Sequence, residues 1–362
     1  NRLKKQRYDI DDEALQEFFP LSHVCTAVFD VYQEMLGLTF HAVKGPDAAG
    51  TGILLWHEDV ELYAVFDATS GQLVGHFLLD IFSRPGKFGH QCVVPLTPCY
   101  TPVAGLSRVR PVCAMLGNMT RPTADRTSLL RFAEVHTFFH EFGHVMHAVC
   151  TDVPYARLSW TWPMMPWPGG VEQDFLEVPS MMLEQFVYDE QVLRRLSRHY
   201  KEEDRSLPAE TIQRIVDARH VGAGLGYRRF VAMALYDLKI HSSPPPYSFG
   251  DATGLTLREL WHRMMTEVSG CAPVADTFMP AAWYHMVIGY DAGYYGYLYS
   301  EVMAADLLGV FKEAGSLLDP TLGLAYRREI LAPCASKGGL DMMRAFLKRD
   351  PSDQAFLELI GI

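Results

Sequence analysis

Residues 128–150 hold the pattern that most restricts how this chain folds. Apolar residues recur there at helical spacing, and the sequence His140-Glu141-Phe142-Gly143-His144 lies among them. Positions i and i+4 of a helix differ by about 40° around its axis, so both imidazoles project from one face. Such a pair supplies two ligands of a tetrahedral zinc ion. Glu141 lies beside them, where its carboxylate can accept a proton from water activated by the metal.

A third ligand has to come from another segment. Residues 171–200 offer four candidate carboxylates on a predicted helix: Glu172, Asp174, Glu177 and Glu184. Two roles are open for Glu177 on this pattern, because its spacing from Asp174 is that of a capping box at a helix start, and it can also bind the metal. His136 and His147 extend the histidine row, but residues so placed more often support a metal site than bind the ion.

The rest of the chain is predicted to be mainly α-helical with a small β-sheet. Helical periodicity covers residues 11–40 and prevails again from residue 128 to the end. Residues 53–82 alternate apolar and polar side chains around the turn at 67–71, which predicts a β-hairpin, and further short strands are expected at 91–96 and 112–116. We therefore expect a helical entry and small sheet in residues 1–127, and a helical zinc- and substrate-binding region in residues 128–362.

Composition excludes several classes of function. The formal net charge is −11 and the basic residues are scattered, which argues against a nucleic-acid surface. No apolar run approaches the roughly 18–20 residues that cross a bilayer. The seven cysteines form no CxxC pair, which favours a reducing compartment. We expect a cytoplasmic monomer, with an organelle-targeting signal upstream of Asn1 as the alternative.

Two further segments each have two interpretations. Tyr290, Tyr294 and Tyr297 share one face if they are helical, where they form either an aromatic core stripe or a row of hydroxyl donors; the interleaved glycines favour a mobile loop or a close approach. Residues 75–80 are either a core strand or an exposed edge on which an extended peptide adds a strand.

Three motifs together resemble the thimet oligopeptidase and neurolysin family of zinc peptidases, along nearly the whole chain. They are Phe139-His140-Glu141-Phe142-Gly143-His144-Val145-Met146-His147, Asp174-Phe175-Leu176-Glu177-Val178-Pro179-Ser180 and Gly289-Tyr290-Asp291-Ala292-Gly293-Tyr294-Tyr295-Gly296-Tyr297-Leu298. Arg84-Pro85-Gly86-Lys87 and Phe346-Leu347-Lys348-Arg349-Asp350-Pro351 add weaker agreement.

The resemblance implies a zincin-like catalytic region that binds one Zn²⁺ per chain, with Glu177 as the third ligand after His140 and His144. It implies that Glu141 is the general base. It also implies catalytic contacts from Tyr290, Tyr297 and His285 and substrate contacts from Tyr294 and Gly289.

Whole members of this family are two-domain, channel-forming oligopeptidases about twice as long as this chain. The resemblance therefore implies that the N-terminal helical domain of the family is absent from this chain. The expected function is that of a zinc-dependent endopeptidase acting on short peptides. A dipeptidyl carboxypeptidase of the same family and a catalytically weak peptide-binding fragment are the alternatives.

Three positions depart from the family pattern. Residues 160–170 form a longer, aromatic connection, which is either a flap over the cleft or a surface excursion. His136 stands where the family tends to have an acidic residue, one turn before the first ligand. Ile288 occupies a position usually filled by glycine.

Overall fold

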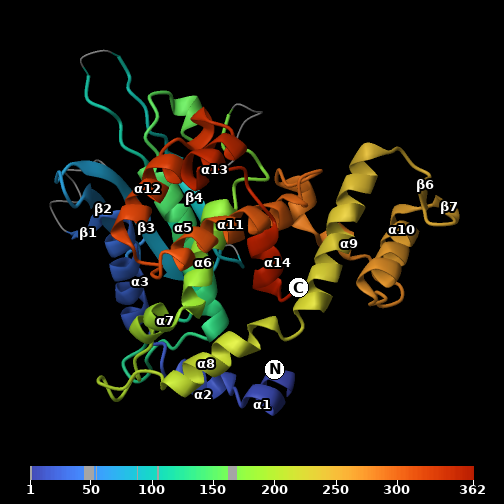
Figure 1. Cartoon of the computed structure of the whole chain (residues 1–362), viewed down its shortest axis with the longest axis horizontal. Helices are drawn as coiled ribbons and strands as arrows, with labels where there is room; N and C mark the ends of the chain where they lie inside the picture. The colour runs from blue at the N-terminus through green and yellow to red at the C-terminus, as the bar shows by residue number, and fades with distance from the viewer. Residues whose placement is uncertain (1, 45–52, 54, 88, 104–105, 162–168) are drawn as a thin grey trace.

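The computed structural model describes residues 2–44, 53, 55–87, 89–103, 106–161 and 169–362. A five-stranded sheet and the helices beside it form a main body, and α9, α10 and a two-stranded ribbon form a lobe that projects from it (Figure 1). The α-helices are α1 (Arg2–Tyr8), α2 (Asp12–Gln16), α3 (Leu21–Leu36), α5 (Phe132–Cys150), α6 (Val178–Glu184), α7 (Glu190–Leu196), α8 (Ala209–Asp217), α9 (Ala223–Ser242), α10 (Leu257–Met264), α11 (Gly296–Glu313), α12 (Pro320–Tyr326), α13 (Gly339–Leu347) and α14 (Gln354–Ile360).

The sheet of the main body has the strand order β1-β2-β3-β5-β4. The strands are β1 (Leu38–Val43), β2 (Glu61–Asp67), β3 (Leu73–Phe82), β4 (Cys92–Thr97) and β5 (Val112–Met119). β3 and β5 run parallel and the other neighbours are antiparallel. The predicted hairpin is confirmed as β2 and β3, and the two further strands are confirmed as β4 and β5. A mainly helical chain with a small sheet is therefore confirmed.

One expectation about the sheet is wrong. Helical spacing was expected to reach residue 40, but α3 ends at Leu36, its C-cap Gly37 has a φ of 63°, the left-handed conformation that stops a helix, and β1 follows at once. Of the two interpretations of residues 75–80, the core strand is confirmed and the exposed edge is wrong, because β3 lies between β2 and β5 and both neighbours occupy its backbone groups. The edge strand on the metal-site side of the sheet is β4.

Helix α5 crosses the sheet, packing against β3, β4 and β5, and carries the histidine pair. Its apolar face, which includes Phe138 and Phe142, is buried in the main core. At the start of the helix the Glu134 carboxylate accepts the backbone N–H of Arg131 at 2.7 Å, which supplies one half of a capping box. Tyr32 of α3 donates its hydroxyl to the Phe139 carbonyl at 2.7 Å. The helix that presents the histidines is thus fixed along its buried side.

A close approach between α5 and α6 sets the depth of the site. Gly143, between the two histidines, is so near α6 that a Cβ atom there would lie 2.9 Å from the Cα of Ser180. Only glycine permits this contact without displacement of a backbone. Because Glu177 directly precedes α6, the contact also determines how near its carboxylate comes to α5.

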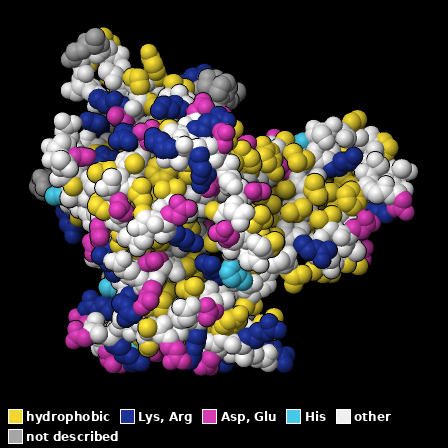
Figure 2. All heavy atoms as spheres, viewed as in Figure 1, with side chains coloured by type: hydrophobic (Ala, Val, Ile, Leu, Met, Phe, Trp, Pro, Cys, Tyr) yellow, Lys and Arg dark blue, Asp and Glu magenta, His cyan; other side chains and the backbone are white. Residues whose placement is uncertain are grey.

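The projecting lobe has a separate core. Its centre includes Tyr236 of α9, Trp261 of α10 and Trp283, all buried, and the ribbon of β6 (Tyr247–Phe249) and β7 (Ala252–Leu255) closes its far end. The ribbon was not foreseen from the sequence. Hydrophobic side chains also gather on the surface of the lobe (Figure 2). Among them, Val231, Leu235 and Leu238 of α9 are 38–42% exposed. In the described part of the chain, no helix is long and apolar enough to cross a membrane.

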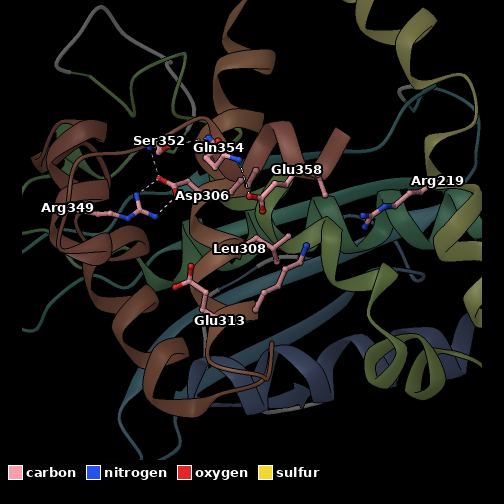
Figure 3. Close-up of a pocket in the computed structure, with 13 residues that line it drawn as sticks. Arg219, Asp306, Leu308, Glu313, Arg349, Ser352, Gln354 and Glu358 are labelled. Carbon is pink, nitrogen blue, oxygen red and sulfur yellow. Dashed lines mark hydrogen bonds and ion pairs between the residues drawn. The ribbon is translucent and has the colours of Figure 1, made fainter. Parts of the chain in front are cut away.

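An ion pair between Arg349 and the buried Asp306 ties the segment before the C-terminal helix α14 to α11. Both guanidinium nitrogens of Arg349 bind the Asp306 carboxylate, at 2.8 and 2.6 Å, and the backbone N–H of Ser352 donates to it at 2.8 Å (Figure 3). Asp306 is 2% exposed, so these donors supply the partners that a buried carboxylate requires. This anchor belongs to the end of the chain and does not line the metal site.

We predict that Gly143→Ala lowers the free energy of unfolding by about 1–3 kcal/mol, because the new methyl group overpacks the contact with α6. Gly309→Ala is the matched control, since the Cβ added in the middle of α11 meets only the Ala355 Cβ at an ordinary 3.7 Å. That control should be neutral or stabilising by about 0.5–1 kcal/mol. Thermal unfolding of both variants checks this, and equal stabilities would contradict the close approach.

Candidate metal centre

Three side chains predicted as metal ligands come together in the structure. His140 and His144 project from one face of α5, and Glu177 reaches them from the start of α6. Glu177 Oε2 lies 3.2 Å from His140 Nε2 and 3.0 Å from His144 Nε2. Among the described residues, this is the one group of three or more His, Cys, Asp or Glu side chains with ligand atoms mutually within 4.8 Å.

The spacing of these atoms fits a tetrahedral metal ion. Bonds of about 2.0–2.1 Å to such an ion separate its ligand atoms by about 3.3 Å, close to the two measured distances. The donor set, two imidazoles and one carboxylate, suits a borderline-soft divalent ion. His140, His144 and Glu177 therefore fit a metal centre with three protein ligands.

The capping-box interpretation of Glu177 is wrong. α6 begins at Val178, so Glu177 is the N-cap residue itself, and its side chain makes no capping hydrogen bond. Its carboxylate is buried and accepts the hydroxyl groups of Ser180, at 2.9 Å, and Tyr290, at 3.2 Å. Burial alone raises the pKa of such a group, but His144 and His140 outweigh burial and hold the pKa of Glu177 well below its usual value.

Glu184 orients the first histidine. Its Oε2 lies 2.6 Å from His140 Nδ1, and a carboxylate only accepts, so Nδ1 carries the proton and Nε2 is left facing Glu177. His136 Nε2 is 3.9 Å from the other oxygen of Glu184. The sequence offered Glu184 only as a possible ligand. Its position seven residues after Glu177, two helical turns along, is the signal from which this supporting role could have been predicted.

Glu141 lies on the wall of the site. It is 8% exposed and lines the same hollow as the two histidines. Burial raises its pKa, an effect that His144 and His140 partly offset. A carboxylate with a raised pKa is a better proton acceptor near neutral pH than an ordinary one.

The metal centre opens into a hollow of about 210 Å³ between β4, α5 and the segment before α11. Sequence reasoning missed several of its walls, among them the edge strand β4. The lining residues are His90, Gln91, Cys92, Val93, His140, Glu141, His144, Thr161, Leu176, Glu177, Tyr284, His285, Ile288, Tyr290 and Tyr297. The His90 ring stacks on Tyr284 with centroids 5.3 Å apart. This contact links the residues just before β4 to the wall formed by the segment before α11.

Two tyrosines and a histidine face the metal centre from that opposite wall. The rings of Tyr290 and Tyr297 stack, with centroids 5.3 Å apart, and the Tyr297 hydroxyl lies 3.5 Å from His285 Nε2. The three tyrosines do not form one helical stripe, because Tyr290 and Tyr294 precede α11, which begins only at Gly296. Burial raises the pKa of Tyr290 and Tyr297 above the ordinary value, so both hydroxyls remain donors at neutral pH.

The remaining predicted positions lie outside the hollow. The Tyr294 ring stacks on Phe230 with centroids 4.8 Å apart and belongs to the core of the lobe. Gly289, at a φ of 95°, is exposed between two lining residues, Ile288 and Tyr290. Of the aromatic connection at 160–170, residues 162–168 lie outside the described residues, while Thr161 lines the hollow.

A histidine pair one turn apart, a carboxylate from a second helix and a neighbouring carboxylate base are typical of a metal-dependent hydrolase. Comparison with known proteins names the family. The model of peptidase family M3 matches residues 1–362, and the chain belongs to that family. The resemblance to the thimet oligopeptidase family is thereby confirmed.

Similar proteins include the thimet-like oligopeptidase of Dictyostelium discoideum, 36% identical over 100% of this chain and 51% of that protein. Saccharolysin of Saccharomyces cerevisiae is 31% identical over 100% of this chain and 49% of its own length. Oligopeptidase A of Escherichia coli is 29% identical over 100% and 50%. The chain thus spans about half the length of the curated relatives it matches.

A solved structure supports the fold. The structure of Pyrococcus furiosus carboxypeptidase superimposes with a TM-score of 0.51 at 12% identity, over 96% of this chain and 59% of that one. At this identity the likeness concerns the fold alone.

We predict that Glu177→Ala abolishes stoichiometric binding of a divalent metal ion, because it removes one of three ligands. Glu184→Ala is the matched control on the same helix: it removes only the partner of His140 Nδ1 and should weaken affinity by about 10–100-fold while one ion still binds at saturation. Titration of each variant with Zn²⁺ measures this. Stoichiometric binding by Glu177→Ala would contradict the ligand set.

Proposed function

We propose that this chain carries the catalytic region of a zinc-dependent endopeptidase that cleaves short peptides, with one zinc per chain. The observation that carries the proposal is the convergence of His140, His144 and Glu177 at tetrahedral spacing, beside Glu141 and at the base of an open hollow. Membership of peptidase family M3 agrees with this chemistry.

Glu141 is the general base in this proposal. A zinc ion held by the three ligands would act as a Lewis acid and lower the pKa of a water molecule bound to it from ~15.7 toward ~7. Glu141, with its raised pKa, accepts the proton of the attacking water and passes it to the amine that leaves when the peptide bond breaks. Its place in the hollow, without a ligand role, suits a group that has to exchange protons.

Tyr297 and His285 are the proposed donors to the developing oxyanion. Both line the hollow, and the 3.5 Å between the Tyr297 hydroxyl and His285 Nε2 brings them to one side of it. Neutral donors aimed at a developing charge in a site shielded from water stabilise the transition state. Tyr290 has a different first contact, because its hydroxyl donates to Glu177, so we assign it to supporting that ligand as well as contacting substrate.

Strand β4 is the proposed backbone partner of the substrate. It ends the sheet, so its outer side has no neighbouring strand among the described residues, and its first residues, Cys92 and Val93, line the hollow. An extended peptide that adds to such an edge gains main-chain hydrogen bonds independent of its side chains. This replaces the alternative interpretation of residues 75–80 as the peptide-binding edge.

We propose that a second, N-terminal domain completes a channel over this site. Relatives are about twice as long as this chain, and the exposed apolar residues of α9 are typical of a surface that other protein covers.

A dipeptidyl carboxypeptidase and a weakly active peptide-binding fragment remain the alternatives; analysis of the end products from one blocked and one free peptide separates them. A cytoplasmic monomer, and a division of the chain at residue 128, also stay predictions.

We predict that Glu141→Gln keeps one zinc per chain yet lowers kcat by at least ~10²-fold, since the amide cannot accept a proton. Metal analysis and turnover of a short quenched-fluorescent peptide measure the two quantities. Because burial raises the pKa of Glu141, the activity of the unaltered protein should fall as the pH drops through that raised value. Near-normal turnover by the glutamine variant would remove Glu141 from the reaction.

We predict that Tyr297→Phe leaves the zinc content unchanged and lowers kcat more than it raises KM. The expected loss is ~2.7–4 kcal/mol of transition-state stabilisation if the hydroxyl is a full oxyanion donor. Tyr63→Phe is the matched control, because the Tyr63 hydroxyl donates to Glu61 at 2.8 Å on β2 and does not line the hollow. Equal kinetics for the two variants would return Tyr297 to a packing role.

A further inference from the structure

Asp237 of α9 is a buried carboxylate that no step of the proposed reaction uses. It has no exposed surface, and both its oxygens point at one segment, residues 289–295, which we call the tyrosine loop. Oδ1 accepts the backbone N–H of Ala292 at 2.9 Å, and Oδ2 accepts that of Tyr294 at 3.0 Å. A side chain of the lobe thus holds the backbone between Tyr290 and Tyr297.

The tyrosine loop needs such an anchor because its backbone is strained. Ala292 has a φ of 56°, in the left-handed region that non-glycine residues rarely adopt. Residues in such conformations persist only when their surroundings hold them. Asp237 accepts one hydrogen bond from the strained residue itself, Ala292, and one from Tyr294, two residues later.

A second contact holds the far side of the loop. The Tyr295 hydroxyl donates to Asp174 Oδ2 at 3.0 Å, in the segment that leads to Glu177. Added Cβ atoms at Gly293 and Gly296 would lie 2.9 Å from Gln173 Cγ and 3.0 Å from Asp174 Cα, so the two backbones touch. The loop is therefore clamped between the segment that carries the third ligand and Asp237.

The site side of this clamp carries the hydroxyl groups. Tyr290, just before Ala292, donates to Glu177 Oε1, and Tyr297, just after the loop, stacks on Tyr290 and lies beside His285. A shift of the loop backbone would move both hydroxyls with it. Misplacement by about 1 Å lowers the rate of a positioned reaction by as much as ~10²-fold.

The charge of Asp237 suits this task. His241, one turn further along α9, has Nδ1 2.8 Å from Asp237 Oδ1, so that oxygen faces a ring nitrogen and a backbone donor. A carboxylate accepts on both oxygens, whereas an asparagine in its place would turn an amide N–H₂ toward a donor on one side. The substitution should therefore release one end of the strained turn.

We propose that Asp237 is a positioning residue for the catalytic tyrosines: it fixes the tyrosine loop so that Tyr290 and Tyr297 face the metal centre. The inference rests on the proposed function of those tyrosines. Asp237 does not line the hollow and acts only through the loop. The lobe therefore contributes to the site although its own side chains form a separate core.

The test compares Asp237→Asn with Asp306→Asn in the zinc-loaded protein. Asp306 is a similarly buried carboxylate that also accepts a backbone N–H, from Ser352 (Figure 3), but it does not line the hollow. Asp237→Asn should speed hydrogen exchange of the amides in residues 289–296 and lower kcat by about 10–10²-fold, with KM and zinc content unchanged. Asp306→Asn should do neither. Asp237→Ser, which admits water to the released N–H, replaces the asparagine variant if that one does not fold.

A double-mutant cycle with Tyr297→Phe separates positioning from general damage. If Asp237 acts through the tyrosine, adding Asp237→Asn to Tyr297→Phe should lower kcat by less than about twofold further. Independent, multiplying losses overturn the inference, as does a kcat for Asp237→Asn equal to that of Asp306→Asn. A normal kcat for Tyr297→Phe would instead contradict the proposed role of Tyr297. The rates of amide hydrogen exchange in residues 289–296 would then still show whether Asp237 holds the loop.

Discussion

The buried carboxylate of Glu177 is the group on which the rest of the site depends. It is 4% exposed, and an ionised group so placed is stable only with charged or hydrogen-bonding partners around it. His140, His144, Ser180 and Tyr290 fill that role from three separate segments. They converge because α5 and α6 touch at Gly143. The close packing of these two helices therefore determines which groups surround the Glu177 carboxylate.

Two carboxylates outside the proposed ligand set hold other groups of the site in place. Glu184 fixes the tautomer of His140, so that the nitrogen facing Glu177 is free to bind. Asp237 holds a strained turn from the lobe, on the other side of the hollow. The main body therefore supplies the ligands and the edge strand, while the lobe contributes the anchor of the facing wall.

Local sequence patterns succeeded where a structure is decided by nearby residues. The hairpin of β2 and β3 follows from alternation and its turn, and α5 from helical spacing. The same patterns failed where a distant contact decided. Residues 38–40 continue a helical spacing, yet they pair with β2 once Gly37 has ended the helix. Asp174 and Glu177 have capping-box spacing, but the Glu177 carboxylate contacts two imidazoles of α5 instead. A rule based on neighbouring residues cannot predict that contact.

By itself, the sequence determined the identity of the chemical groups: a histidine pair at i and i+4 on a helix, a glutamate between them and a row of tyrosines among glycines. It also determined, through three motifs, the family to which the chain belongs. Residue spacing alone left open which carboxylate meets the histidines, although the family resemblance implied Glu177. Only the tertiary structure decided that β4 is the edge strand beside them, and that Tyr294 packs into the lobe while Tyr297 faces the hollow. The reason is physical: residue spacing fixes directions along one helix or strand, whereas distances between elements follow from how closely their backbones pack.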